Sequence, residues 1–189
     1  MAKKEQAVRA TIICFAAATV LACGCSAGQK DIQSPIKDGL SMAWHWVDGE
    51  NSYEMHYAFR KTGTDAYTVA YVTDSRYRGG HDRQPITEWT IDNMFRRRSL
   101  GETDVMMVQG CPIWIDPASL REGKDARWRV TKEETVLGRT AYKAQDSVTP
   151  AVGWFDCETG LLLISELNDG SASVRSELIE SNADGLIKP

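Results

Sequence analysis

Hydrophobic and polar residues alternate along much of the chain from Ser41 onward, and a period of two is typical of a β-strand with one buried face. The pattern is clearest from Tyr53 to Arg60, where large apolar side chains at odd positions alternate with polar or small ones. The segment Asp48–Asn51 before it has the composition of a tight turn. The pattern therefore predicts a hairpin whose first strand starts at Ser41.

A turn centred on Gly49 and Glu50 sets the register of this hairpin, because each residue before the turn then faces one after it. Large apolar residues of both strands fall on one face. They are Met42 together with the six candidate ligand-binding residues Trp44, Trp46, Tyr53, Met55, Tyr57 and Phe59. Two interpretations stay open: this face is the concave wall of a ligand site, or it is the hydrophobic core under a covering segment.

Short strands at regular spacing continue to the C-terminus and predict a mainly β fold, a curved antiparallel sheet with little helix. We expect a loop at Arg76–Pro85 and one helical turn at Pro117–Glu122. Ile86–Arg98 is predicted as two strands, because its apolar residues scatter on a helical wheel. The further strands expected are Ala66–Thr73, Ile86–Ile91, Met94–Ser99, Val105–Val108, Ile113–Asp116, Trp128–Lys132, Thr140–Asp146, Val152–Phe155, Leu161–Leu167 and Ser173–Glu180.

The N-terminal residues resemble an export signal. Three basic residues precede the apolar stretch Ala10–Ala22, which is too short to cross a bilayer. Small residues then lead to Cys23, as in the bacterial lipobox, so we expect lipidation at Cys23. Cys25 is a second choice of acceptor, and an ordinary signal peptide or an uncleaved anchor are the alternatives. The predicted organisation is a signal peptide (1–22), a lipidated N-terminus and tether (23–38), and a single β-rich domain (39–189).

Charge bears on the choice of partner. The whole chain has a formal net charge of −4, and the signal region carries +2, so the remainder is close to −6. That balance predicts no nucleic-acid partner. The basic run Arg96–Arg98 suits a phosphate headgroup or an acidic partner, or else it is a solvated strand edge. We expect an exported protein, anchored outside the cytoplasmic membrane or in the outer membrane, that needs no cofactor.

Cys111 and Cys157 remain after removal of the signal, and export places them where disulfides persist. Each cysteine lies in a turn-like context, so a bridge between the two is predicted. Two free thiols, or a bridge from Cys25 to one of them, are the alternatives.

Motifs for catalysis are not recognisable in this chain, and we expect a binding protein rather than an enzyme. In the predicted hairpin register His45 faces Glu54, and His56 lies diagonally from His45 on the same face. Two imidazoles and a carboxylate could hold Zn²⁺. An exposed strand face offers such a site little support, so no metal is expected and a metal-dependent hydrolase is the weaker alternative.

The second half of the chain resembles the carriers that sort outer-membrane lipoproteins, the LolA/LolB-like group. The likeness lies in the strand–turn–strand segment Trp89–Arg96, the "ETV-x-G-x-x-AYK" stretch Glu134–Lys143, the "W-x-D-x-x-TGL" hairpin Trp154–Leu161 and the closing strand Leu178–Asn182. It implies an unclosed barrel whose concave side holds acyl chains. The long amphipathic helix that begins those carriers has no counterpart here, because Pro35 and Gly39 interrupt Asp31–Leu40.

Together these features predict a membrane-anchored envelope lipoprotein that binds a lipid or another amphiphilic ligand in a concave sheet. A structural lipoprotein that packs on a protein partner in an envelope complex is the alternative, and its partner is not named by the sequence.

Overall fold

The computed structural model describes residues 34–48, 50–99, 102–168, 170 and 173–183. The chain divides into two units, Met1–Asp31 and Ile32–Pro189, of which the first lies outside the described residues. The predicted signal peptide and the lipidated Cys23 therefore lie outside them as well. Within the described ranges, no helix is long and apolar enough to cross a membrane.

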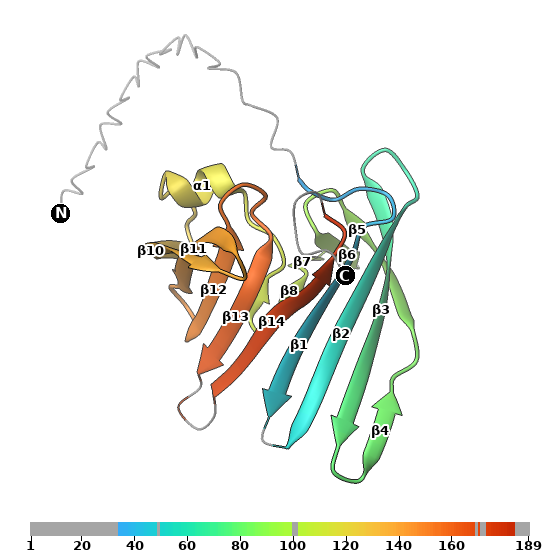
Figure 1. The fold of residues 1–189 in the computed structure, drawn as a ribbon. Coiled ribbons are helices and arrows are strands. Elements are labelled where there is room, and N and C mark those ends of the chain that lie inside the picture. Colours follow the sequence, from blue (N-terminus) through green and yellow to red (C-terminus); the bar gives the residue numbers. More distant parts are fainter. Residues whose placement is uncertain (1–33, 49, 100–101, 169, 171–172, 184–189) are drawn as a thin grey trace, which may run out of the picture. The chain divides into compact units, whose positions relative to one another are not determined.

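Twelve strands form one antiparallel sheet, which is curved and does not close into a barrel (Figure 1). This confirms the predicted fold class. The strand order is β10-β11-β12-β13-β14-β1-β2-β3-β5-β6-β7, with β4 paired to β3, and β8 and β9 form a separate ribbon. The strands are β1 (Ser41–Asp48), β2 (Asn51–Lys61), β3 (Ala66–Tyr77), β4 (Gly80–Arg83), β5 (Thr87–Asp92), β6 (Arg96–Ser99), β7 (Glu102–Val105), β8 (Met107–Val108), β9 (Cys111–Pro112), β10 (Trp128–Val136), β11 (Arg139–Asp146), β12 (Ala151–Asp156), β13 (Leu162–Asn168) and β14 (Ser173–Ser181).

The hairpin β1–β2 has the register that its sequence predicts. Trp46 pairs with Tyr53, Trp44 with Met55, and Met42 with Tyr57. The last strand, β14, lies on the other side of β1 and joins the two halves of the sheet. The face that carries these large apolar residues is called the core face below, and the opposite one the outer face.

A segment between β7 and β10 covers the core face. This segment, Met106–Leu120, is called the cover, and most of its apolar side chains are buried. Its backbone is tied to the β12–β13 turn, because Leu162 N donates to the Ile113 carbonyl at 2.8 Å and Ile115 N donates to the Gly160 carbonyl at 3.1 Å. These two bonds fix the cover to the sheet at the β12–β13 turn.

The cover ends in the helix α1 (Pro117–Arg121), which confirms the single helical turn that the sequence predicts. Asp116 caps it by accepting the backbone N–H of Ala118 and Ser119, at 3.1 and 3.2 Å. Pro117 opens the helix, a position where its missing N–H has no intrahelical partner to lose.

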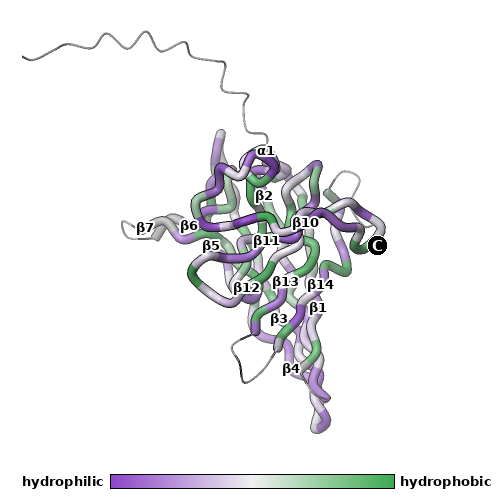
Figure 2. The backbone as a smooth tube through the Cα atoms, turned by 90° about the vertical axis from the view of Figure 1, so that its left-hand side faces the viewer, coloured by the Kyte–Doolittle hydropathy of each residue, from purple (hydrophilic) through white to green (hydrophobic). Residues whose placement is uncertain are grey.

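Two sequence predictions of local structure are wrong. Arg76–Pro85 was expected to be a loop, but β3 continues to Tyr77 and turns directly into β4. This hairpin is hydrophilic along its length (Figure 2), so it lacks the apolar alternation by which a strand is recognised.

The second error concerns the cover. The strand expected at Ile113–Asp116 is reduced to an isolated bridge between Trp114 and Leu161, and the one expected at Val105–Val108 is divided between β7 and β8. The chain breaks at Met106, whose N–H donates to the Phe95 carbonyl at 2.9 Å. A segment that crosses a sheet face is held mainly by its buried apolar side chains and does not pair along its backbone. Its apolar content is therefore similar to that of a strand, and content alone led to the wrong prediction.

Candidate functional site

The six residues predicted to bind a ligand lie mainly in the core. Trp44, Met55, Tyr57 and Phe59 are buried in the hydrophobic cluster, and Trp46 and Tyr53 are half-buried. Trp44 meets Tyr57 edge-on, with ring centroids 5.7 Å apart. Of the two interpretations of this face, a hydrophobic core under a covering segment describes most of it. Tyr57 also borders two of the pockets described below.

An apolar groove of about 370 Å³ lies beside the cover. Two of its lining side chains, Val105 and Met107, are 42% and 40% exposed. The groove combines residues of the β5–β6 turn, β6, β7, the cover, and the loop that leads from α1 into β10. Its walls are Met94, Arg96, Val105, Met107, Pro112, Trp114, Ile115, Asp116, Ser119, Asp125, Arg127 and Trp128.

Charged groups at the rim of this groove are paired with one another or with the backbone. Arg127 donates to both carboxylate oxygens of Asp146, at 2.8 and 2.7 Å. Arg96 Nε donates to Asp92 at 2.8 Å. Asp125 accepts the N–H of Trp128 at 2.7 Å. With these groups already paired, what the groove offers a ligand is chiefly apolar surface.

The Arg127–Asp146 pair is the strongest electrostatic feature near the groove. Hydrogen bonding to Arg127 holds the pKa of Asp146 well below its usual range, and the same bond raises the pKa of Arg127. Asp146 is fully buried, whereas the Arg127 side chain is 46% exposed. The pair therefore joins the loop before β10 to the end of β11 and supports one wall of the groove.

A second pocket, of about 220 Å³, adjoins the groove and shares Val105 and Met107 with it. We call it the Trp89 pocket; its lining residues are Tyr57, Trp89, Arg97, Asp104, Val105, Met106 and Met107. The Arg97 guanidinium carbon lies 5.4 Å from the Trp89 ring centroid. Burial, with a smaller contribution from Tyr71, raises the pKa of Tyr57, so its hydroxyl stays protonated.

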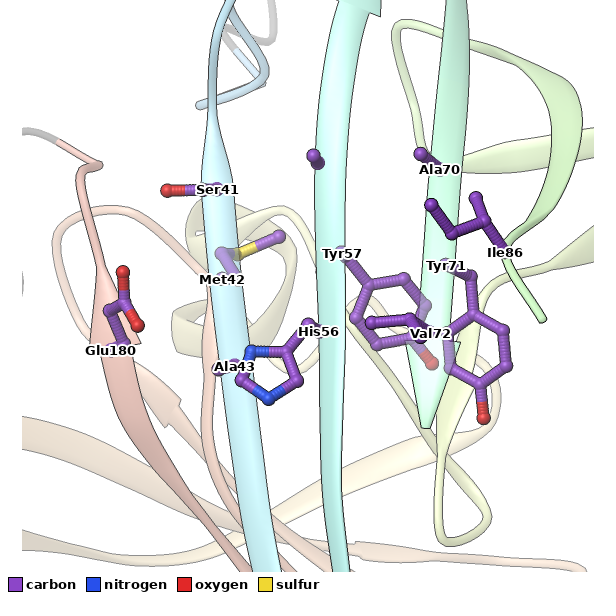
Figure 3. A pocket seen from close by; sticks show the side chains of 11 residues that line it. Ser41, Met42, Ala43, His56, Tyr57, Ala70, Tyr71, Val72, Ile86 and Glu180 are labelled. Carbon is purple, nitrogen blue, oxygen red and sulfur yellow. The ribbon is translucent and has the colours of Figure 1, made fainter. Parts of the chain in front are cut away.

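A third hollow, also about 220 Å³, involves the outer face of β1, β2 and β3 (Figure 3). The hollow forms because the side chains here are small, among them Ala43, Ala58 and Ala70. His56 and Glu180 lie at its border. A larger hollow of about 770 Å³ lies around α1 and β10. Many of its lining residues are charged or polar, which suits an apolar chain less well than the groove does.

The histidine cluster is only partly assembled. His45 pairs with Glu54 in the sheet register, and His56 Nε2 lies 3.2 Å from Glu54 Oε2. In the described ranges, no group of three or more His, Cys, Asp or Glu side chains is placed to hold a metal ion. The three side chains that the weaker hydrolase alternative requires thus do not converge.

The predicted Cys111–Cys157 bridge is not formed, and both cysteines are free. Gly110, the neighbour of Cys111, lies against Ala151 at the start of β12, whereas Cys157 follows the end of that strand. A strand of this length separates them by about 3.3 Å per residue, far beyond the roughly 4.4–6.8 Å between Cα atoms that a disulfide allows. Turn-like surroundings suggested a bridge between two loops, but they do not tell at which end of the sheet each cysteine lies.

The basic run is divided between two environments. Arg96 faces the groove and Arg97 the Trp89 pocket, since neighbouring residues of a strand point to opposite sides. The alternation was predictable; the pockets on either side were not, because residues distant in sequence complete them.

No protein-family model matches this chain, and no curated protein is similar enough to count as a relative. Among solved structures it is similar to MucB in complex with MucA(peri), with a TM-score of 0.42 and 15% identity over 79% of this chain and 51% of that one. The MucA/MucB complex of Pseudomonas aeruginosa gives 0.44 and 16%, over 84% and 55%. The hypothetical protein CT021 from Chlamydia trachomatis gives 0.34 and 11%, over 82% and 94%.

The chain spans about half the length of the chains it matches in the two Muc complexes. At these TM-scores and identities the similarities assign neither a family nor a function.

Proposed function

We propose that this protein is an exported, lipid-anchored envelope protein that binds the acyl chain of an amphiphilic ligand in the apolar groove. The observation that carries the proposal is the exposure of Val105 and Met107 within a recess walled by Trp114 and Trp128. A ligand that covers them removes apolar surface from water, and each buried methylene contributes about 0.8 kcal/mol.

The size and composition of the groove support an apolar ligand. Ligand pockets are concave and mostly apolar, with volumes of roughly 300–1,000 Å³. At about 370 Å³ the groove falls at the lower end of this range, which suits one chain better than a bulky ring system. The resemblance of Trp89–Asn182 to the lipoprotein-sorting carriers points to the same ligand class.

Binding without catalysis is part of the proposal. The carboxylates nearest the groove are occupied, Asp116 by the α1 backbone and Asp125 by backbone N–H groups. Burial raises the pKa of the Cys111 thiol to about 12, so this cysteine is a poor nucleophile at neutral pH. These groups act as structural supports of the recess.

Anchoring follows from the N-terminal pattern. Acylation at Cys23 would hold the domain at a membrane surface, where amphiphiles are abundant, and two or more chains are needed for stable attachment. The ligand would then reach the groove from the membrane to which the protein is attached.

One experiment tests both the lipid anchor at Cys23 and the binding of an acyl chain in the groove. Cells that express the full chain are fed a photoreactive, alkyne-tagged fatty acid and irradiated, and the protein is purified under denaturing conditions and mapped by mass spectrometry. We expect label on the Cys23 peptide with or without light, from acylation. Label on peptides from residues 94–128 should depend on light.

Met107→Glu places a charge in the groove and should remove most of the light-dependent label. Ile179→Glu is the matched control, because Ile179 is 42% exposed on β14, away from the groove. Equal light-dependent labelling of both variants and the unmodified chain would contradict groove binding. A Cys23 peptide without label would contradict the anchor and leave the groove result intact.

A protein partner is the second candidate function, because the core face is already filled by the cover and the outer hollow is bordered by Ile86, which is 66% exposed. Crosslinks from the outer face to one protein, with none from the groove to lipid, would favour it.

A further inference from the structure

The Trp89 pocket contains an exposed cation, Arg97, and the indole N–H of Trp89, which has no acceptor within the described residues. Arg97 lies over the face of Trp89, and no ion pair joins it to a carboxylate within the described ranges. Its cross-strand neighbour Asp104 lines the same pocket without pairing to it. By contrast Arg96, next to it in sequence, has Asp92 at 2.8 Å.

Trp89 supplies the donor. Its ring is half-buried, and the indole Nε1 is buried with no hydrogen-bond acceptor in the part of the chain that the structure describes. A buried donor without an acceptor costs free energy, so such groups usually have a role or a missing partner. The nitrogen has almost no accessible surface, so an acceptor entering the Trp89 pocket from outside would satisfy it after a small rotation of the indole ring.

The two features lie beside the apolar groove. Val105 and Met107 line both recesses, so a molecule whose chain lies in the groove can place its polar end in the Trp89 pocket. An anionic oxygen there would meet the Arg97 guanidinium and accept the Trp89 N–H. Charge-assisted hydrogen bonds of this kind are stronger than those between neutral groups.

We propose that the ligand is an anionic amphiphile, whose acyl chain occupies the apolar groove and whose phosphate or carboxylate binds Arg97 and Trp89 Nε1. This rests on the proposed function and names the class of ligand. Among the described residues that line the pocket, Asp104 is the one carboxylate; it opposes an anion, so it limits the affinity.

The test uses the full chain carrying Cys23→Ser, so that no acyl group of its own competes for the groove. Two photoreactive probes with the same acyl chain are titrated, a monoacylglycerol and a lysophosphatidylglycerol, and crosslinking to residues 94–128 is measured. We expect half-saturation by the anionic probe at a concentration about ten-fold lower, the ratio expected for one charge-assisted hydrogen bond. Raised salt should reduce this ratio.

Variants test which side chains cause the preference for the anionic probe. Arg97→Gln should remove most of the difference in half-saturation between the two probes without weakening the uncharged one. Trp89→Phe, which keeps a ring but removes the N–H, should remove a smaller part of it. Asp104→Asn should increase it. Arg83→Gln, which changes an exposed arginine on β4, should leave the ratio unchanged.

Glycerol phosphate, the headgroup without a chain, should compete weakly with the anionic probe. Competition as strong as that by the whole lipid would indicate a phosphate site independent of the groove and overturn the proposal.

The failure of this inference differs from that of the proposed function. If both probes label residues 94–128 with equal half-saturation, the groove binds acyl chains and the anionic preference is wrong. If neither probe labels them, the proposed function is wrong as well.

Discussion

Trp46 and Tyr53 stack across the β1–β2 hairpin, with ring centroids 4.8 Å apart and an interplanar angle of 13°. They face each other in the strand register and lie at the half-buried end of the core face. Stacked aromatic pairs contribute beyond the area they bury. This contact therefore helps to set the register of the hairpin on which the core face is built.

A double-mutant cycle measures that contribution. Trp46→Ala and Tyr53→Ala should each destabilise the full chain, and the double variant should lose about 1 kcal/mol less than the sum of the two. Urea unfolding followed by circular dichroism gives the three free energies. Additive losses would show that the rings stabilise the hairpin only by separate burial.

Gly160 should be among the positions most sensitive to substitution. Its φ is +73°, and a Cβ there would overlap the carbonyl oxygen of Ile115 in the cover. Gly160→Ala should cost about 3 kcal/mol or more, because the left-handed backbone strain adds to the displacement of the cover. Gly138→Ala is the matched control: its φ is +74° and nothing lies within 4 Å of the added carbon, so about 1 kcal/mol is expected. Equal losses in denaturant unfolding would contradict the tie between cover and sheet.

The Arg127–Asp146 pair predicts a loss of stability in acid. Because the folded pKa of Asp146 lies below the unfolded value of about 3.9, the pair stabilises the fold above that pH and loses its effect as the pH falls toward the folded pKa. Asp146→Asn should cost about 2 kcal/mol at pH 7.

The unfolding free energies of wild type and Asp146→Asn should then converge below about pH 4. Asp82→Asn, on the exposed strand β4, should leave both the neutral-pH stability and its pH dependence unchanged. A constant difference between Asp146→Asn and wild type from pH 7 to pH 2 would show that the carboxylate charge is not what stabilises the fold.

The two cysteines should differ in reactivity. Cys111 is fully buried, and burial raises the pKa of its thiol to about 12, whereas Cys157 is half-buried. In the native chain an alkylating reagent should modify Cys157 first and Cys111 only after unfolding. Peptide mapping without reduction measures both, and a peptide that joins Cys111 to Cys157 would contradict their separation along β12.

Alternation along the chain determined most of the strands and, for β1–β2, their register. A period of two assigns each side chain to a face, and the turn at Gly49 and Glu50 then decides which residues meet, so Trp46 and Tyr53 could be paired from sequence. Pro117 likewise indicated α1, because a proline at the first position of a helix acts within a few residues. These features depend on local stereochemistry, which sequence expresses directly.

Only the tertiary structure decided what lies on each face. The groove joins Met94, Met107 and Trp128, and the Trp89 pocket joins Trp89 to Arg97 and Met107, through a cover whose path no periodicity describes. The path of the cover also places Cys111 near the start of β12, whereas Cys157 follows the end of that strand. Periodicity states that a face is apolar, but packing against distant segments determines whether that face becomes core, groove or pocket.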